Sequence, residues 1–291
     1  MSQRGIKISV VIPTYNRPEA LSKCLQALER QTLDEDWEVL VVDDGGETDL
    51  EPIVLMFEHR LNVTLLKQEN SGPASARNNG VQKARGKYIA FLDDDCEPEE
   101  TWLQELLKHA RPGVVVGGKT ENKLHSNRYA EASQQLVSFL YEVWYDTTWF
   151  FFTSNNFLIH RQCFLDAGSF DESFTRAAGE DREFCTRLLN QGYKLNHAPK
   201  AIINHSHHLS LKSYWRQHFN YGKAAVRYRT KLFSYGVPLP KAKLGFYMAM
   251  LKYPMHLSEF RVSKRLTLSG IIAISQLATF LGYLAGRRSH D

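Results

Sequence analysis

The first hundred residues alternate between short apolar runs and segments with the periodicity of amphipathic helices. The apolar runs are rich in β-branched residues and predict four strands, at residues 6–12, 37–42, 63–67 and 88–92. Apolar residues with helical spacing lie between these strands, at residues 19–31, 50–59 and 74–84. The alternation predicts an α/β fold with a mostly parallel, twisted, Rossmann-like sheet and helices on both of its faces.

The pattern becomes less regular after residue 98. The remaining predicted strands lie at residues 114–117, 150–159 and 201–204. The remaining predicted helices lie at residues 129–145, 179–191 and 211–229. We expect one α/β domain over residues 1–208, followed by a basic helical extension over residues 209–291.

Three of the predicted strands end in polar clusters. These clusters are Pro13-Thr14-Tyr15-Asn16, Asp43-Asp44-Gly45 and Asp93-Asp94-Asp95. Ligands of parallel α/β sheets bind beyond the carboxyl ends of the strands, so the clusters mark the expected site. Three adjacent carboxylates repel one another, and Asp93 and Asp95 point to the same side of an extended chain, where they could share Mg²⁺ or Mn²⁺. The alternative is an ordinary acidic turn before Pro98.

Composition and charge exclude several other classes of protein. Hydrophobic residues make up 43% of the chain, which is enough for a real core, and a net charge of +4 is too small to indicate nucleic-acid binding. The cysteines lie far apart, at Cys24, Cys96, Cys163 and Cys185. We interpret them as reduced thiols in a cytosolic setting, without a disulfide frame or a zinc site. The apolar segment at residues 8–12 is too short for a signal peptide.

The C-terminal part is basic and ends in an apolar helix. Between residues 201 and 288 there are fourteen Lys or Arg residues and one acid, Glu259. The apolar segment 266–286 is flanked by Lys264-Arg265 and Arg287-Arg288. Basic pairs at both ends are unusual for a single span and suit a helix that lies on an anionic leaflet, although a helix packed on the protein's own core is also possible. We predict membrane association and leave the mode open.

Five motifs, in this order along the chain, resemble the family 2 glycosyltransferases. They are VVIPTYNR (10–17), VVDDG (41–45), GPASARNNG (72–80), FLDDD (91–95) and GED (179–181). The resemblance implies the GT-A fold, which binds nucleotide sugars, over about residues 6–208. It divides the predicted domain into a nucleotide-sugar half, about residues 1–98, and an acceptor half, about residues 99–208.

The resemblance also implies roles for the strand-end residues. Either Asp43 or Asp44 contacts the base, with Asp43 preferred, while the other acid caps the turn. The donor nucleotide is further bordered by Pro13, Tyr15, Arg17, Arg77 and Asp94. In this family Arg77 corresponds to an arginine near the diphosphate, and Asp94 faces the sugar or ribose. Asp93 and Asp95 are the implied metal ligands, and the metal neutralises the departing nucleoside diphosphate.

The second half supplies the implied base and a third metal ligand. Asp181, in the Glu180-Asp181 pair that opens a predicted helix, is the candidate general base, and a helix N-terminus favours its ionised form. His205 is the candidate third ligand, with His207 competing because the two share a strand face. Four further residues are candidates for contact with the sugar or acceptor: Asn155, Asn156, Glu180 and Trp102. Core packing is the alternative for Trp102.

The predicted function is inverting transfer of a sugar from a UDP, dTDP or GDP donor to a glycan or lipid-linked acceptor. We expect the protein at the inner face of the cell membrane. One alternative is a sugar nucleotidyltransferase, but the Pro-Thr-Tyr-Asn-Arg-Pro loop at residues 13–18 lacks the glycine-rich character typical of that class. Another is a non-catalytic nucleotide- or glycan-binding protein with the same fold. The sequence indicates neither the sugar, the linkage nor the oligomeric state.

Overall fold

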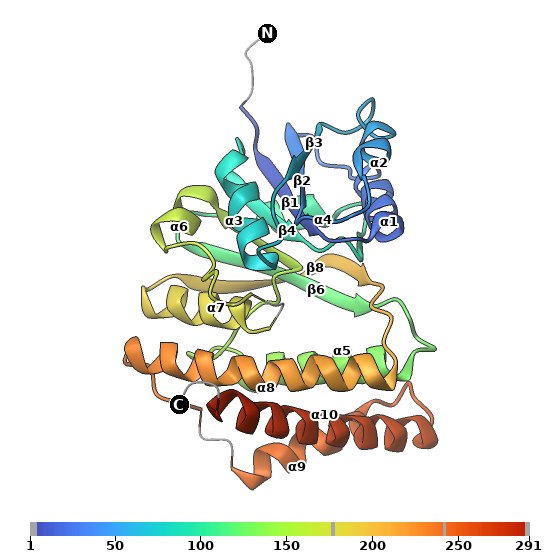
Figure 1. Cartoon of the computed structure of the whole chain (residues 1–291), viewed down its shortest axis with the longest axis vertical. Coiled ribbons are helices and arrows are strands. Elements are labelled where there is room, and N and C mark those ends of the chain that lie inside the picture. Colours follow the sequence, from blue (N-terminus) through green and yellow to red (C-terminus); the bar gives the residue numbers. More distant parts are fainter. Residues whose placement is uncertain (1–4, 176–177, 241–242, 289–291) are drawn as a thin grey trace. The chain divides into compact units, whose positions relative to one another are not determined.

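In the computed structural model, which describes residues 5–175, 178–240 and 243–288, strands and helices alternate through the N-terminal half. The N-terminal elements are β1 (Ile8–Thr14), α1 (Pro18–Leu28), β2 (Trp37–Asp43), α2 (Glu51–Leu55), β3 (Val63–Lys67), α3 (Pro73–Lys83) and β4 (Tyr88–Leu92). Strand β1 pairs in parallel with both β2 and β4, and β2 pairs in parallel with β3. Helices α1 and α2 lie on one side of these strands and α3 lies on the other (Figure 1). The predicted Rossmann-like arrangement is confirmed for this half.

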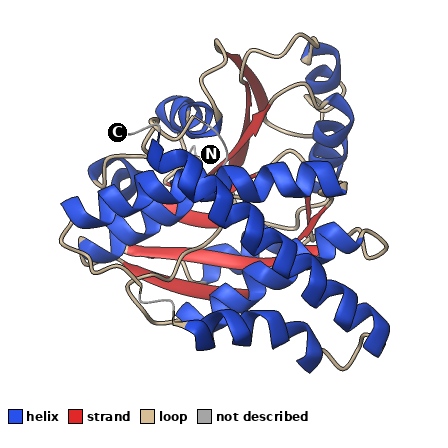
Figure 2. Ribbon diagram, turned by 60° about the horizontal axis from the view of Figure 1, so that its bottom comes forward, coloured by secondary structure: helices blue, strands red, loops and turns tan. Residues whose placement is uncertain are grey.

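The sheet continues with antiparallel strands beyond β4. The next elements are β5 (Cys96–Pro98), α4 (Trp102–Lys108), β6 (Val114–Asn122), α5 (Arg128–Trp144), β7 (Asn156–His160), α6 (Arg161–Asp166), α7 (Glu180–Asn190) and β8 (Lys194–His205). The strand order is β3-β2-β1-β4-β7-β6-β8-β5, and the pairs β4–β7, β6–β7 and β5–β8 are antiparallel. The result is a mixed sheet flanked by helices (Figure 2).

Different helices cover the two faces of the parallel strands. Ile8, Val10 and Ile12 alternate along β1 and join a core that also includes the apolar face of α1. Helix α3 covers the opposite face, and Gly80 permits its close approach, because a Cβ there would lie 2.4 Å from Val11 Cγ1. Strands buried on both faces read as continuous apolar runs, which explains why they were predictable.

Several predicted elements differ in length from the observed ones. The strand expected at residues 150–159 begins only at Asn156, because Thr153 turns the chain by accepting a hydrogen bond from Asn156 N at its carbonyl and donating one from its hydroxyl to Asn155. Helix α2 ends at Leu55, short of the predicted residue 59. Strands β6 and β8 are longer than predicted. Many of the residues that the prediction left out are only partly buried and polar, so they do not form an apolar run in the sequence.

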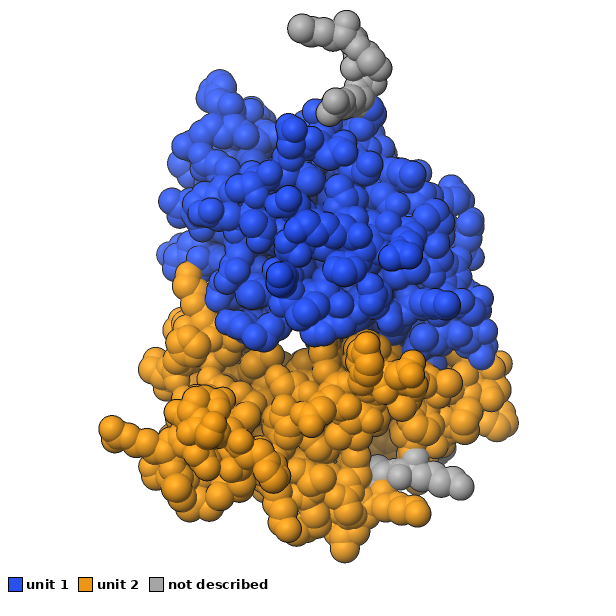
Figure 3. All heavy atoms as spheres, turned by 180° about the vertical axis from the view of Figure 1, so that it is seen from behind, with its two compact units in different colours: residues 1–121, 152–206 blue, residues 122–151, 207–291 orange. Residues whose placement is uncertain are grey.

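The chain forms two compact units, each made of two segments (Figure 3). Unit 1 comprises residues 1–121 and 152–206 and contains the sheet, while unit 2 comprises residues 122–151 and 207–291. The helices of unit 2 are α5, α8 (Leu211–Ser234), α9 (Leu244–Lys252), the 3-10 turn η1 (Tyr253–His256) and α10 (Val262–Arg288). The division into domains at residue 208 remains a prediction, because compact packing units need not fold separately.

Unit 2 is a helical layer with its own core. Leu136 and Phe139 of α5 pack with Tyr214 of α8 and with Leu268 and Ile272 of α10. Helix α8 begins with a capping box formed by Ser210 and Ser213, in which each side chain accepts a hydrogen bond from the other residue's backbone N–H. Within the described residues, α10 is the helix that is long and apolar enough to cross a membrane by length and composition.

Candidate functional site

The carboxyl ends of β1, β2 and β4 lie at the same edge of the sheet and bring the predicted polar clusters together. Parallel pairing sets Thr14 opposite Asp43 at the ends of β1 and β2, and β4 on the other side of β1 leads into the acidic triplet. Thr14 Oγ1 donates a hydrogen bond of 2.7 Å to Asp94 Oδ2. The edge is therefore a polar site made of residues distant in sequence.

The three carboxylates of the triplet have different surroundings. Asp94 is buried, and Arg17 contacts both Asp94 Oδ1 (3.1 Å) and Asp95 Oδ2 (3.0 Å). Burial raises the pKa of Asp94 to about 6, although the Arg17 charge and the Thr14 hydroxyl act in the opposite direction. Burial lowers the pKa of Arg17, but the three aspartates outweigh it and raise that pKa, so Arg17 stays charged.

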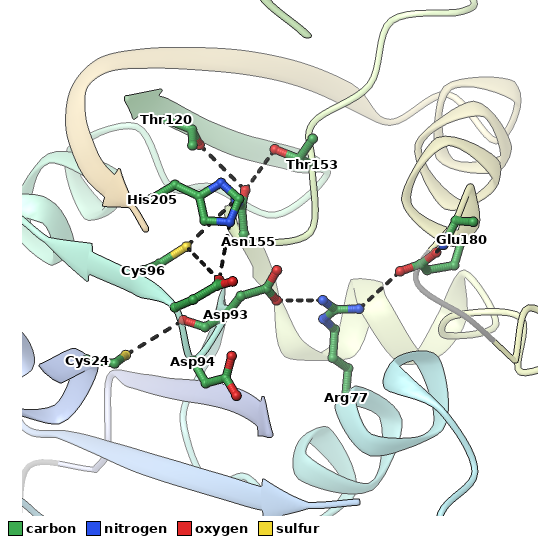
Figure 4. A network of polar contacts seen from close by, with 12 residues as sticks. Cys24, Arg77, Asp93, Asp94, Cys96, Thr120, Thr153, Asn155, Glu180 and His205 are labelled. Carbon is green, nitrogen blue, oxygen red and sulfur yellow. Dashed lines mark hydrogen bonds and ion pairs between the residues drawn. The ribbon is translucent and has the colours of Figure 1, made fainter. Parts of the chain in front are cut away.

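Arg77 connects the triplet to the helix that carries the candidate base. Its side chain is 3% exposed, and its guanidinium contacts Asp93 Oδ1 at 2.6 Å and Glu180 Oε1 at 3.3 Å (Figure 4). The guanidinium also lies 5.8 Å from the centre of the Phe170 ring. Since two carboxylates already neutralise Arg77, its geometry suits a residue that positions them. The predicted contact with a diphosphate remains a prediction.

Helix α7 begins beside this pair. Gly179, in a left-handed conformation with φ 88°, precedes Glu180, whose Oε2 accepts a hydrogen bond of 2.9 Å from Ala178 N. Asp181 is only partly buried, and its Oδ1 accepts a hydrogen bond of 2.7 Å from Arg182 N. Phe184, one turn on, packs 4.8 Å from Phe170 and 5.1 Å from Phe164 between ring centres. An aromatic core therefore fixes the start of α7.

Both acids of α7 hold protons more tightly than usual. Burial raises the pKa of Glu180, and the neighbouring Asp181 charge adds to this effect against the Arg77 charge. Burial also raises the pKa of Asp181, against hydrogen bonds from the backbone and the charges of Arg182 and Arg77. The expectation that the helix N-terminus favours the ionised form of Asp181 is thus incomplete, because burial acts the other way. A raised pKa makes the ionised carboxylate a stronger base.

A candidate metal centre lies where β5 and β8 pair. Their antiparallel register sets Cys96 opposite His205, and His205 Nε2 lies 3.2 Å from Asp95 Oδ1. Ligand atoms of Asp95, Cys96 and His205 all lie within 4.8 Å of one another. Burial raises the pKa of Cys96 well above its usual value. The carboxylate and imidazole donors of Asp95 and His205 suit Mn²⁺ better than Mg²⁺.

His205 is held by the acids around it. Burial lowers its pKa, but the hydrogen bond to Asp95 and the charges of Asp95 and Asp93 outweigh burial, so the pKa is raised. His207 lies beyond the end of β8, in the segment assigned to unit 2. The choice of His205 over His207 as a metal ligand remains a prediction, to which the Asp95 contact now adds support.

The two acids at the end of β2 do different jobs. Asp44 accepts hydrogen bonds from Gln68 Nε2, Ser71 N and Gly72 N, which uses both of its oxygens in fixing the loop before α3. Asp43 accepts one bond through Oδ1, from Gly46 N at 2.9 Å, and within the described residues its Oδ2 has no protein partner. This asymmetry is consistent with the preference for Asp43 as the base contact.

Pro13 is partly buried at the end of β1, whereas Tyr15 is 49% exposed just beyond it. The Tyr15 ring is therefore accessible for stacking on a base. Both assignments remain predictions.

Trp102 and Asn156, two of the predicted sugar or acceptor contacts, are buried and hydrogen-bonded within the fold. Trp102 has no exposed surface, lies in the core of unit 1, and donates from Nε1 to Asn156 Oδ1 at 2.8 Å. A ring that stacks on a sugar needs an exposed face, so Trp102 cannot do so. The amide of Asn156 is likewise used internally, since it also donates to the carbonyls of Lys119 and Ala201. Both residues hold β7 to its neighbours.

Asn155 differs from Asn156, because its side chain lies among the candidate ligands. Its Nδ2 contacts Cys96 Sγ at 3.8 Å, and its Oδ1 accepts hydrogen bonds from Thr153 and Thr120 (Figure 4). Asn155 stays a candidate.

Sequence reasoning missed two contributors to the site. Thr14 belonged to a polar strand end of the expected site but was given no role, although a hydroxyl there is a ready hydrogen-bond donor to an acid. Asn16, with φ 54°, accepts hydrogen bonds through Oδ1 from Glu47 N (2.7 Å) and Thr48 N (3.3 Å) and so holds the loop after β2. Its position between Tyr15 and Arg17 gave no signal of this contact.

Comparisons with known proteins agree with this arrangement. The model of glycosyl transferase family 2 matches residues 9–170, more than half of the chain. The chain is similar to chondroitin synthase of Escherichia coli, with 29% identity over 235 residues, 68% of this chain and 34% of the relative. It is similar to validoxylamine A glucosyltransferase of Streptomyces hygroscopicus subsp. limoneus, with 34% identity over 219 residues, 64% of this chain and 48% of the relative. The chain thus spans about a third to a half of these relatives.

Solved structures show the same fold. Mannosyltransferase PcManGT from Pyrobaculum calidifontis has a TM-score of 0.63 and 19% identity, over 99% of this chain and 87% of that one. S. aureus TarS 1–349 in complex with UDP-GlcNAc has a TM-score of 0.56 and 16% identity, over 98% of this chain and 91% of that one. At these identities the likeness concerns the fold, which is GT-A-like. With the match to the family model, these findings establish that the chain belongs to glycosyl transferase family 2.

Proposed function

We propose that the protein is an inverting, metal-dependent glycosyltransferase that moves a sugar from a nucleoside-diphosphate donor to a hydroxyl of a glycan or lipid-linked acceptor. The observation that carries the proposal is the link through Arg77, which joins Asp93, a predicted metal ligand, to Glu180 beside the candidate base. A transferase needs both groups at one site, one for the leaving group and one for the acceptor.

The nucleotide would lie across the ends of β1 and β2. There the free oxygen of Asp43 can accept an N–H of the base, and the exposed ring of Tyr15 can stack on it. The charge of Arg17 lies beside Asp94 and Asp95 and can attract the diphosphate. A bound Mn²⁺ or Mg²⁺ would supply positive charge to the departing diphosphate, with Asp93, Asp95 and His205 as the residues to hold it.

The reaction would then need one proton transfer by the protein. The acceptor oxygen attacks C1 of the sugar as the bond from C1 to the diphosphate oxygen breaks on the opposite face. The acceptor proton passes to the Asp181 carboxylate, and the nucleoside diphosphate leaves as an anion. Glu180, buried and bonded to Arg77 and Ala178 N, would orient this end of α7 and could border the sugar.

The neighbours support a nucleotide-sugar donor and leave its identity open. PcManGT was solved with GDP-Man and Mn²⁺, and TarS with UDP and with UDP-GlcNAc. The relatives include a chondroitin synthase and a hyaluronan synthase, which favours a glycan acceptor. We further propose that the protein acts at the inner face of the cytoplasmic membrane, where activated sugars and lipid-linked acceptors meet.

Calorimetry tests the donor half of this proposal. UDP, GDP and dTDP would be titrated into wild type, Asp95→Ala and Asp49→Ala, with and without Mn²⁺. We expect metal-dependent binding of one nucleotide by wild type and by Asp49→Ala, whose aspartate is exposed and pairs with Lys67. We expect Asp95→Ala to lose the metal dependence while keeping its cooperative thermal transition. No nucleotide binding by wild type would contradict the proposal.

Turnover separates a transferase from its alternatives. Incubation with the matching nucleotide sugar should release nucleoside diphosphate slowly, and faster once an acceptor is found. Binding without release would favour a non-catalytic binding protein. Formation of a nucleotide sugar from a sugar phosphate and a nucleoside triphosphate would favour a nucleotidyltransferase.

A further inference from the structure

One face of α10 is exposed and apolar over most of its length. Its members recur every three or four positions and are Leu266, Gly270, Ala273, Leu277, Phe280 and Leu284. Leu277 is 53% exposed and Phe280 is 57% exposed. Surface helices of soluble proteins carry polar side chains on this face, so another apolar phase is expected to cover it.

The opposite face of α10 packs closely on α8. Glycines make the approach possible, since a Cβ at Gly222 would lie 2.0 Å from Thr279 O and one at Gly282 would lie 2.0 Å from Phe219 O. Tyr214 also donates from its hydroxyl to Ile271 O at 3.3 Å. Helices α8 and α10 run parallel to each other and stay in contact over several turns, as Figure 1 shows.

This packing excludes a span by α10 alone. If α10 crossed a bilayer, α8 would have to enter the hydrocarbon beside it. Helix α8 carries six basic residues: Lys212, Arg216, Lys223, Arg227, Arg229 and Lys231. Charges in hydrocarbon are expensive unless they are paired, and α8 contains no acid to pair with them. A position of α10 in the plane of the interface avoids this cost.

Helix α9 extends the exposed apolar surface within unit 2. It contacts α10, and among its residues Leu244 is 77% exposed, Tyr247 41% and Met248 44%. Helix α9 has no acid, and Lys243 and Lys252 lie at its two ends. Apolar side chains bordered by lysines are typical of helices that lie in the headgroup region of a membrane.

We propose that the exposed faces of α9 and α10, the α9–α10 surface, bind an anionic lipid leaflet, with α10 lying in the plane of the membrane. Arg261, just before α10, and Arg287 and Arg288 at its other end are exposed and would contact the headgroups. Charge complementarity favours this occupant, since residues 201–288 contain fourteen basic residues and one acid. The inference rests on the proposed membrane location and specifies its mode, and it needs no part of the reaction.

Vesicle flotation of the full chain tests the occupant. We expect binding to vesicles of phosphatidylcholine with phosphatidylglycerol, weaker binding at high salt, and little binding to phosphatidylcholine alone. Leu277→Gln with Phe280→Gln should reduce the partition coefficient roughly tenfold, because two half-exposed apolar side chains are lost. The matched control is Leu55→Gln with Met56→Gln at the C-terminal end of α2. These residues are 50% and 56% exposed, and the variant should bind like wild type.

Each outcome of the flotation experiment decides whether the α9–α10 surface binds lipid. Equal loss in both double variants, or no binding by wild type, would overturn it. Absence of lipid binding together with a concentration-dependent dimer in sedimentation would instead assign the surface to a second copy. Nucleotide binding should be unchanged in both double variants, so a failure here is distinguishable from a failure of the proposed transferase activity.

Labelling of the two ends of α10 tests its orientation. Ser263→Cys and Arg288→Cys would be made separately with Cys163→Ser, since the other three cysteines are buried. A membrane-impermeant maleimide would be applied to inside-out and right-side-out membrane vesicles. We expect both ends to be labelled only in inside-out vesicles. Labelling of the two ends from opposite sides would show a span and overturn the in-plane position.

Discussion

The two units depart from the usual distribution of side chains in opposite ways. Unit 1 buries charge, since Asp94, Arg77 and Glu180 are each at most 3% exposed. Unit 2 exposes apolar surface, since Leu244 and Phe280 are each more than half exposed. Both departures cost free energy in an isolated protein. The difference indicates two kinds of partner, a small charged ligand for unit 1 and an extended apolar one for unit 2.

Unit 1 offsets the cost of its buried charges by pairing them with one another. Unit 2 covers only one of the apolar faces of α10 and leaves the other exposed. Arg17 and Arg77 together contact all three acids of the triplet and Glu180. In unit 2, α10 buries its small residues against α8, while Leu277 and Phe280 of its apolar stripe are more than half exposed. The charged side chains of unit 1 are thus fixed by one another, whereas the apolar stripe of α10 stays accessible.

The largest effect should follow from removing a metal ligand. We expect Asp95→Asn to lower the transfer rate on the order of 10³-fold, because the departing diphosphate would lose several kcal/mol of charge stabilisation. The check is a steady-state assay with a Mn²⁺ titration and with EDTA. Asp49→Asn, at the exposed pair with Lys67, should keep the wild-type rate. A normal rate in Asp95→Asn would remove it from the metal centre.

Loss of the base should be nearly as large and should spare binding. We expect Asp181→Asn to lower the rate about 10²-fold or more while the nucleotide dissociation constant stays near that of wild type. Single-turnover kinetics and calorimetry measure the two quantities separately. If donor binding weakened as much as turnover, Asp181 would be a structural cap of α7. Asp166→Asn, at an exposed aspartate of unit 1, is the control.

In unit 2, Gly282→Val should disrupt the packing of α10 against α8. Its side chain would meet Phe219 O, so we expect the free energy of unfolding to fall by about 2–3 kcal/mol. Gly270 has nothing within 4 Å of an added Cβ, so Gly270→Ala should raise stability by about 0.5–1 kcal/mol. Thermal and urea unfolding measure both. Equal effects of the two substitutions would disprove the close packing.

The last comparison concerns how the free energy of unfolding depends on pH. His218 of unit 2 and Asp94 of unit 1 should contribute with opposite signs. His218 is 1% exposed, and burial lowers its pKa to about 4. The unfolded state takes up a proton near pH 6.5 and the folded state does not, so stability is lost as the pH falls. Between pH 7 and pH 5 this amounts to about 2 kcal/mol, and His218→Gln should abolish it. An unchanged pH profile in that variant would show that His218 is protonated in the folded protein.

Asp94 should act in the reverse direction in protein treated with EDTA. Its pKa of about 6 lies above the unfolded value, so its contribution to stability is present at pH 4 and is lost as the pH rises through 6. Asp94→Asn should therefore steepen the loss of stability on acidification, whereas His218→Gln should flatten it. Unfolding curves at pH 5 and pH 7 distinguish the two.

Local patterns predicted the parallel half of the fold well and the antiparallel half poorly. Strands β1, β2 and β4 are buried on both faces, so their apolar runs identify them without further context. The β5–β8 pair joins Cys96 to His205, more than a hundred residues apart, and depends on tertiary contacts that no short pattern contains. The presence of a strand was therefore predictable where it is buried on both faces. The lengths of the strands beyond β4 were not predictable.

The candidate site was predictable where side chains follow strand ends. Asp43, Asp93 and Asp95 lie where the alternation of strands and helices indicates. The burial of Trp102 and Asn156 was not predicted, because a polar or aromatic side chain gives the same sequence signal whether it faces a ligand or a neighbouring core residue. The pairing of Arg77 with both Asp93 and Glu180 could not be predicted, because it depends on how α7 approaches α3.

The two-segment make-up of unit 2 has a consequence for biosynthesis. Helix α5 leaves the ribosome long before α10, yet Leu136 and Phe139 of α5 share a core with Leu268 and Ile272. This core cannot close until nearly the whole chain has been synthesised, while the segments of unit 1 are complete some eighty residues earlier. The apolar face of α5 therefore stays uncovered during translation, so the order of synthesis favours completion of unit 1 before the core of unit 2 can close.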